Sequence, residues 1–179
     1  MSAAVRHEKT YLVRYVPAQI EGAASEIIED AYIPESADHG RLRLRHRGDR
    51  YQLSKRFATD QADFSTLSEL TIELTGEEYA AFRSLTAKVV RKRRFYCTIY
   101  GRPAEVDVFL DELDGLMIID FPFNDAAEMS GFQPPEVCLA DITQEPVADG
   151  GYLAGKTYGQ IQYELERFDY VPQFIEKEY

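Results

Sequence analysis

The sequence alternates between charged and apolar residues over most of its length, and this period of two limits the chain to a fold built mainly from β-strands. The clearest example is residues 41–47, which read Arg-Leu-Arg-Leu-Arg-His-Arg and place the arginines on one face of a strand. Gly48 and Asp49 follow as a two-residue hairpin turn of the kind that begins with glycine. The pattern therefore predicts a strand, a tight turn and a returning strand over residues 50–57.

The same alternation predicts strands in further parts of the chain. These segments span residues 5–15, 27–33, 67–74, 89–100, 103–110 and 115–123. With the hairpin they give about eight strands, mostly joined as antiparallel neighbours. Two or three helices accompany them, so the fold class is α+β, with helices packed on a large antiparallel sheet or barrel.

The best-defined helix is predicted to start after Thr75. This residue is a suitable N-cap, and Glu78, three positions later, completes a capping box. Tyr79, Phe82 and Leu85 would form the apolar stripe of this helix. Shorter helices are predicted over the ranges 124–129 and 160–168.

The length and composition predict one domain, residues 1–179, in the cytoplasm. A chain of 179 residues fits the usual domain size of roughly 100–200 residues. The apolar run over residues 116–119 is far shorter than the roughly 20 residues that a membrane span needs. The first residues contain no apolar stretch typical of a secretion signal. Two cysteines, Cys97 and Cys138, are too few for a disulfide framework and suit a reducing compartment.

Charge is distributed unevenly along the chain. The net charge is −11, yet residues 1–102 hold 17 of the 20 Lys and Arg residues and 14 of the 31 Asp and Glu residues. The basic part would suit an anionic ligand, or the two parts would neutralise each other in the fold. The negative total argues against broad nucleic-acid binding, which relies on a basic surface.

Two arrangements would account for strands with one charged and one apolar face. A sandwich would expose the charged faces to water. A barrel would instead turn them inward around a wet, charged tunnel, with helices covering part of the apolar exterior. An enclosed lumen of this kind needs acidic and basic groups in balance, because a buried charge without a partner is costly. The composition fits both arrangements.

The charged strand positions follow one another in a particular order. In sequence they are Glu8, Arg43, Arg45, Lys55 or Arg56, Glu69, Glu73, Lys92, Arg94, Asp107 and Asp120. Strand parity favours Arg56 over Lys55, because Arg56 shares a face with Gln52 and Ser54. This order resembles that of the CYTH-like triphosphate tunnel family, which includes CyaB-type adenylate cyclases, thiamine triphosphatases and inorganic triphosphatases.

The resemblance implies an antiparallel, eight-stranded, tunnel-like β-barrel with flanking helices that binds a triphosphate together with Mg or Mn. In this interpretation the phosphate-binding residues are Arg43, Arg45, Lys55 or Arg56, Lys92 and Arg94. The metal ligands are Glu8, Glu69, Glu73, Asp107 and Asp120, of which Glu8, Asp107 and Asp120 are also assigned as catalytic. Arginine binds phosphate oxygens through two parallel hydrogen bonds, and carboxylates suit Mg and Mn.

Parity also separates neighbouring charges that the resemblance does not use. Arg91 and Arg93 alternate with Lys92 and Arg94, so they are predicted to point to the outer surface. Glu105 shares a face with Asp107, but the resemblance selects only the aspartate. We therefore expect Glu105 to lie on the surface.

Three positions depart from the family pattern. Arg6 stands where the first glutamate is expected, Thr10 where a lysine is expected, and Pro122 where the last glutamate is expected. The two missing carboxylates would belong to one metal site, and Arg6 adds a positive charge there. These departures argue against the Mg or Mn ion that the resemblance implies.

Three functions are therefore compared. The leading one is binding of a triphosphate-bearing small molecule, with metal-dependent hydrolysis to diphosphate and phosphate where the metal site is intact. The alternative is a non-catalytic phosphate-binding, nucleotide-binding or regulatory module that has lost its metal site. A third is a nucleic-acid or protein interaction domain that would use the arginines of residues 41–47 on an open sheet.

The departures at Arg6 and Pro122 generate a direct prediction. Because two carboxylates are absent from one site, the purified chain should hydrolyse tripolyphosphate weakly or not at all with Mn. Replacing both residues with glutamate should raise the affinity for Mn. The measurements are phosphate release and Mn titration, and robust turnover by the unaltered chain would refute the hypothesis.

Overall fold

Nine β-strands form one antiparallel sheet within the described part of the chain. The computed structural model describes residues 2–36, 42–60 and 63–175, and the side chains of residues 2–5, 56–60, 63–64 and 67 lie outside that description. The strands are β1 (Ser2–Val13), β2 (Ala24–Ile33), β3 (Leu42–Arg47), β4 (Arg50–Asp60), β5 (Asp63–Leu74), β6 (Val89–Ile99), β7 (Arg102–Phe109), β8 (Met117–Phe123) and β9 (Cys138–Asp141).

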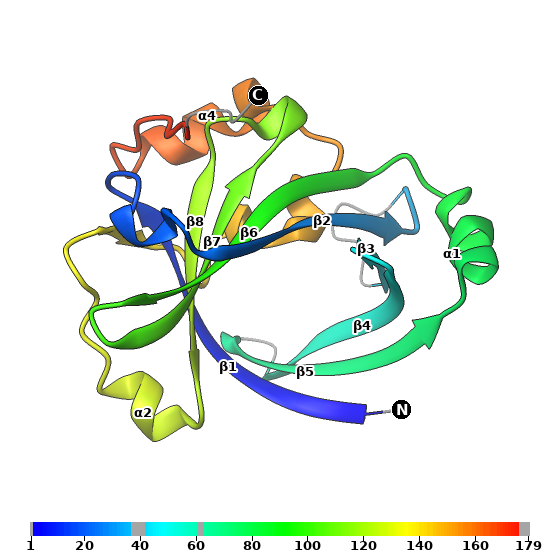
Figure 1. Cartoon of the computed structure of the whole chain (residues 1–179), viewed down its shortest axis with the longest axis horizontal. Helices are drawn as coiled ribbons and strands as arrows, with labels where there is room; N and C mark the ends of the chain where they lie inside the picture. The colour runs from blue at the N-terminus through cyan, green and yellow to red at the C-terminus, as the bar shows by residue number, and fades with distance from the viewer. Residues whose placement is uncertain (1, 37–41, 61–62, 176–179) are drawn as a thin grey trace.

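The sheet closes on itself through β1. Its order is β5-β4-β3-β2-β6-β7-β8-β1-β9, and β5 also pairs with β1. The first half of β1 pairs with β5 from Ser2 to His7, and the second half pairs with β8 from His7 to Leu12. Strands β1 to β8 therefore form the ring seen in Figure 1. This confirms the predicted antiparallel tunnel-like barrel.

The ninth strand corrects the predicted number of eight. β9 pairs with residues 11–13 of β1, on the edge that β5 leaves vacant. It has four residues and follows Pro134 and Pro135, so its alternation is too short to recognise. The tight turn at Gly48 and Asp49 is confirmed, since β3 ends at Arg47 and β4 begins at Arg50.

Helices and 3-10 turns flank the ring, and the segment with Ala148 and Gly150 reaches the cavity inside it. The helices are α1 (Gly76–Arg83), α2 (Ala126–Ser130), α3 (Gly150–Leu153) and α4 (Tyr158–Glu166), with 3-10 turns η1 (Ala18–Ile20), η2 (Asp111–Leu113) and η3 (Pro146–Ala148). The capping box of α1 is present as predicted, between Thr75 and Glu78. Its predicted apolar stripe is confirmed only in part: Tyr79 and Phe82 are half-buried, and the centroid of the Tyr79 ring lies 4.8 Å from that of Tyr51, whereas Leu85 is 59% exposed.

Most of the hydrophobic core lies on the outer side of the ring, while Tyr32, Val90, Phe109 and Ile118 of the same cluster face the inside. Tyr11 and Phe121 point away from the lumen and meet edge to face, with 6.0 Å between ring centroids. Ile161 and Leu165 of α4 are buried in the same cluster, and Figure 1 shows α4 outside the ring. The apolar faces therefore serve the packing of helices, which leaves the charged faces for the inside. Across the residues described, no helix has the length and apolar character needed to span a membrane.

Tyr170 connects the segment after α4 to the start of β8. Its hydroxyl accepts a hydrogen bond from Met117 N at 2.8 Å and donates one to Gly115 O at 2.9 Å, and the residue is 5% exposed. Tyr170→Phe leaves both buried backbone groups without this partner. We expect a loss of about 1–3 kcal/mol in the free energy of unfolding, measured in urea. Tyr163→Phe at an 80% exposed site is the control; equal effects of the two variants would contradict the prediction.

Candidate functional site

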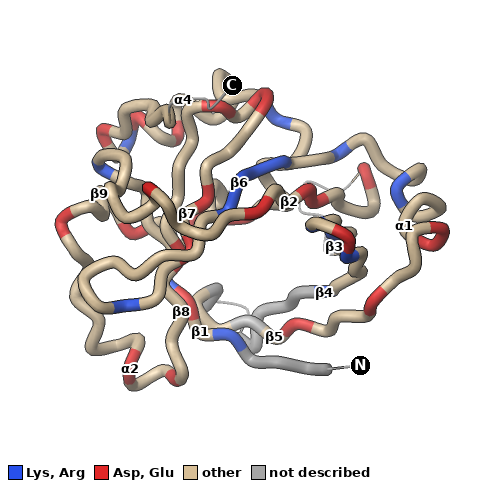
Figure 2. The backbone as a smooth tube through the Cα atoms, in the orientation of Figure 1, with Lys and Arg blue, Asp and Glu red and all other residues tan. Residues whose placement is uncertain are grey.

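Charged side chains from separate strands converge inside the ring. The cavity is lined by Arg6, Glu8, Thr10, Asp30, Tyr32, Arg43, Arg45, Val90, Lys92, Arg94, Asp107, Phe109, Ile118, Asp120, Ala148 and Gly150. Figure 2 shows acidic and basic positions on the neighbouring strands β6, β7 and β8. The barrel interpretation of the sequence is thereby confirmed over the sandwich, because Arg43, Arg94 and Asp107 are all buried.

Arg94 contacts three carboxylates of the cavity. Its Nε and Nη2 donate to the two oxygens of Asp107, each at 2.6 Å, and Lys92 Nζ donates to the same carboxylate. Burial alone would raise the pKa of Asp107, but the charges of Arg94 and Lys92 lower that pKa to about 2. Asp107 is therefore a carboxylate whose two oxygens are both occupied by cations.

A second bidentate pair joins β2 to β3. Arg45 Nε and Nη2 donate to the oxygens of Asp30 at 2.7 and 2.6 Å. Burial opposes the charged form of Asp30, but Arg45 outweighs it and holds the pKa of this carboxyl well below its usual range. The sequence interpretation missed Asp30. Asp30 shares one face of the predicted strand 27–33 with Ile28 and Tyr32. This period of two was the signal that could have identified it as an inward residue.

Glu69 on β5 lies between two arginines. Arg43 Nη2 donates to Glu69 Oε1 at 2.7 Å, and Arg6 Nε lies 3.7 Å from Glu69 Oε2. The two contacts differ in burial, since the Arg6 side chain is 46% exposed and that of Arg43 only 7%. Arg6 is therefore the more loosely held of the two cations.

Asp120 on β8 faces β1. Thr10 Oγ1 donates to Asp120 Oδ1 at 2.7 Å, and Arg94 Nη2 lies 3.4 Å from Asp120 Oδ2. Burial, followed by the negative charges of Glu8 and Asp107, raises the pKa of Asp120 to about 7. In the register of the two strands Thr10 is opposite Asp120 and Glu8 is opposite Pro122.

Several predicted residues are not brought into this cluster. Lys55 is exposed and lies opposite Leu42 and Leu70, on the other face of the sheet from Ser54. The alternative, Arg56, has a side chain outside the described residues. Glu73 is exposed and accepts hydrogen bonds from Arg50 and Gln52, away from the other proposed ligands.

The parity predictions for neighbouring charges can also be checked. Arg93 is exposed, and Arg91 pairs with Glu29 and Asp111 outside the lumen. Both point outward as predicted. The expectation for Glu105 is wrong, because Arg94 Nη1 donates to it. Glu105 lies on the same inward face of its strand as Asp107. Strand parity therefore predicts its location better than the family pattern does.

The residues present do not fit a divalent metal. Asp107 is saturated by cations, Asp120 accepts from Thr10, and Pro122 offers no side-chain oxygen opposite Glu8. Among the residues that the structure describes, no group of three or more His, Cys, Asp or Glu side chains is placed to hold an ion. A Mg or Mn ion normally takes several oxygen ligands from protein and substrate, so this donor set is too poor and too cationic.

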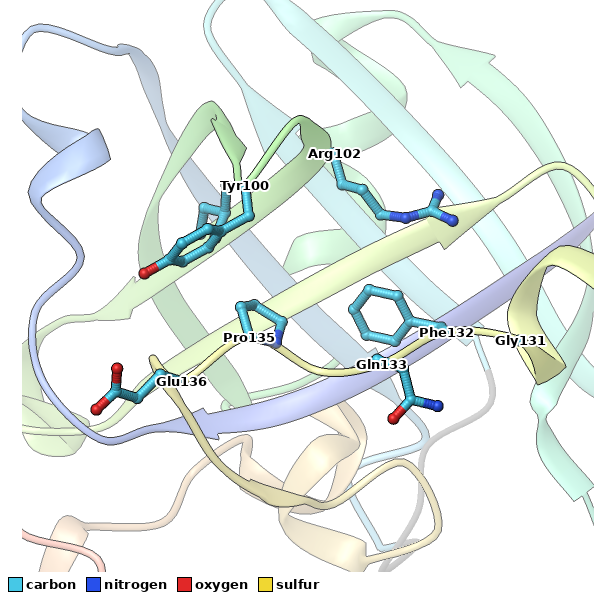
Figure 3. A pocket seen from close by; sticks show the side chains of 8 residues that line it. Tyr100, Arg102, Gly131, Phe132, Gln133, Pro135 and Glu136 are labelled. Carbon is cyan, nitrogen blue, oxygen red and sulfur yellow. The ribbon is translucent and has the colours of Figure 1, made fainter.

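A larger hollow lies elsewhere on the molecule. It has a volume of about 520 Å³ and lies between the β6–β7 turn at Tyr100 and the segment that carries Phe132 and Pro135 (Figure 3). None of the predicted site residues lines it. We therefore take the charged cavity of the barrel, although smaller, as the candidate site.

The comparisons with known proteins support the fold. No protein-family model and no curated protein matches the sequence. A crystal structure described as the hypothetical protein NE1496 matches with a TM-score of 0.62 and 21% identity, over 85% of this chain and 99% of the other. A second, described as the inorganic triphosphatase NE1496, matches with a TM-score of 0.60 and 21% identity, over 83% and 96%.

These likenesses define the class of fold. The chain has the CYTH-like triphosphate tunnel fold, as the ordered charges of its strands predicted. The resemblance noted in the sequence is therefore confirmed at the level of the fold.

The raised pKa of Asp120 generates a pH-dependent prediction. Because its pKa is higher in the folded state than the ordinary value of 3.8, its stabilising contribution is complete below about pH 4 and is lost as the pH rises through about 7. Asp120→Asn stays neutral, so its stability gain over the unaltered chain should grow from pH 4 to pH 8. Urea unfolding at several pH values measures this. Asp49→Asn in the exposed turn is the control, and a gain that is constant with pH would contradict the assignment.

Proposed function

We propose that the charged cavity binds a triphosphate-bearing small molecule. The observation that carries this proposal is the gathering of three buried arginines, Arg43, Arg45 and Arg94, with Lys92 around one lumen. Guanidinium groups bind phosphate oxygens through planar, bidentate hydrogen bonds, and a low-dielectric lumen strengthens each of them.

The balance of charge explains how such a lumen can exist before a ligand enters. Five cations and four carboxylates line the cavity, and Glu69 and Glu105 lie against it. Each buried arginine has a carboxylate partner, which avoids the cost of an uncompensated buried charge. Phosphate oxygens can replace these carboxylates at the same donors, so a chain of several phosphates suits the site better than a single anion.

The structural neighbour described as an inorganic triphosphatase supports a triphosphate as the ligand. Inorganic triphosphate, thiamine triphosphate, a nucleotide and polyphosphate all carry the required chemistry. The nucleic-acid alternative loses its basis, because Arg43 and Arg45 are 6% and 8% exposed and cannot be presented on an open sheet.

Two versions of the function remain, and they differ in chemistry. Metal-dependent hydrolysis to diphosphate and phosphate is the first version, and the same neighbour, described as an inorganic triphosphatase, supports the hydrolysis itself. Binding without hydrolysis is supported by the poor metal donor set at Glu8, Asp107 and Asp120. The second version is the one that the residues of this chain favour, because hydrolysis of this kind relies on a bound ion to orient or activate the attacking water.

A paired substitution tests the binding site. Asp30→Asn with Arg45→Met removes one buried cation together with its partner, so no lone charge stays in the lumen. Tripolyphosphate should raise the melting temperature of the unaltered chain, and its affinity for the double variant should fall roughly tenfold or more. A concentration series in a thermal-shift assay measures both.

The matched control is Arg91→Met with Asp111→Asn, an exposed ion pair on the outer surface. It removes the same charges and should leave the ligand-induced shift unchanged. Absence of any shift with tripolyphosphate, thiamine triphosphate and ATP would contradict the proposed function. Release of phosphate with Mn would favour the hydrolytic version.

A further inference from the structure

Arg6 differs from the other arginines of the cavity in the bonds it would have to give up. Its closest recorded partner, Glu69 Oε2, is 3.7 Å away, whereas Arg43 and Arg45 donate to carboxylates at 2.6–2.7 Å. Its side chain is 46% exposed, against 7% and 9% for the other two. Arg6 can therefore turn toward an entering anion without breaking a short, buried hydrogen bond.

The position of Arg6 is close to the acidic side of the cavity. It shares one face of β1 with Glu8 and Thr10, and all three line the lumen. Alternate residues of a strand are about 7 Å apart, a distance that a long guanidinium side chain covers. The Arg6 guanidinium can therefore reach the region where Glu8 and Asp120 lie. A metal bound in this region would need carboxylates that have no cationic partner.

The same positive charge has opposite effects on the two ligands. It repels a divalent cation at the Glu8 side of the lumen, and it attracts phosphate oxygens there. A guanidinium also donates several hydrogen bonds in a fixed plane, which suits a phosphate group. One residue can therefore weaken metal binding and strengthen phosphate binding together.

We propose, on the basis of the proposed function, that Arg6 binds the triphosphate directly and supplies the positive charge that a metal ion would otherwise supply, so that this chain binds triphosphate without a metal. Arg6 is then a specificity-determining residue of the cavity. It selects the free triphosphate anion, whereas a site with carboxylates at positions 6 and 122 would select the metal complex.

Calorimetric titration with inorganic tripolyphosphate tests the proposal, in EDTA and in excess Mn. The unaltered chain should bind in EDTA, and excess Mn should weaken the apparent affinity severalfold or more, because Mn converts the free tripolyphosphate anion into its metal complex. Arg6→Gln should weaken binding in EDTA roughly tenfold or more, because it removes a charge-assisted contact. Arg6→Lys keeps the charge and should recover much of the loss. Arg6→Glu should bind weakly in EDTA and regain affinity when Mn is added.

The control is Arg93→Gln, which removes the same charge from the exposed outer face of β6 and should not change the affinity. Since Arg6 is nearly half exposed, its variants should keep the melting temperature of the unaltered chain to within a few degrees. Only variants that keep the melting temperature in this way are compared in the titrations. Arg6→Gln by itself is enough to test the role of Arg6.

The outcomes separate this proposal from the function on which it rests. Binding by the unaltered chain only in Mn would overturn the role of Arg6 and leave the triphosphate site intact. Equal affinities of the unaltered chain and Arg6→Gln in EDTA would also overturn it. An unaltered chain that binds tripolyphosphate in neither buffer would overturn the proposed function itself.

Discussion

The buried ion pairs of the lumen are the constraint on which the rest of this structure depends. Arg94 with Asp107, and Arg45 with Asp30, are bidentate pairs between adjacent strands, and all four residues are at most 8% exposed. Burying each charge costs several kcal/mol, and removing one partner of such a pair typically costs about 3–5 kcal/mol. The pairs are therefore tolerable only if every strand keeps its register.

Contacts on both faces of the sheet fix the register of its strands. A slip of one residue would move Asp107 to the outside and Val106 and Val108 into the lumen, so the polar and apolar sets would be misplaced together. The outer packing around Tyr11 and Phe121 and the inner ion pairs thus stabilise the same alignment. Closure by β1, which pairs with β5 and β8 in succession, also removes free sheet edges along most of the ring.

Parity within a strand explains which parts of the site could be predicted. Lys92 and Arg94 were distinguished from Arg91 and Arg93 by alternation alone, and the structure places the two pairs on opposite faces. Asp30 was missed, because a single acid between Ile28 and Tyr32 resembles an ordinary strand position until its neighbour, Arg45, is known. Pairing between strands is a non-local property, and a sequence pattern reports it only indirectly.

The sequence by itself determined eight of the nine described strands, their two unlike faces, the β3–β4 turn and the capping box at Thr75, because each depends on residues close together in the chain. Only the tertiary structure decided that the charged faces enclose a lumen, which carboxylate meets which cation, and that Glu73 and Lys55 stay outside the cluster. It also decided that Arg6 lies against Glu69, more than sixty residues away. Closure of the ring brings such positions together, and closure is a property of all eight strands at once.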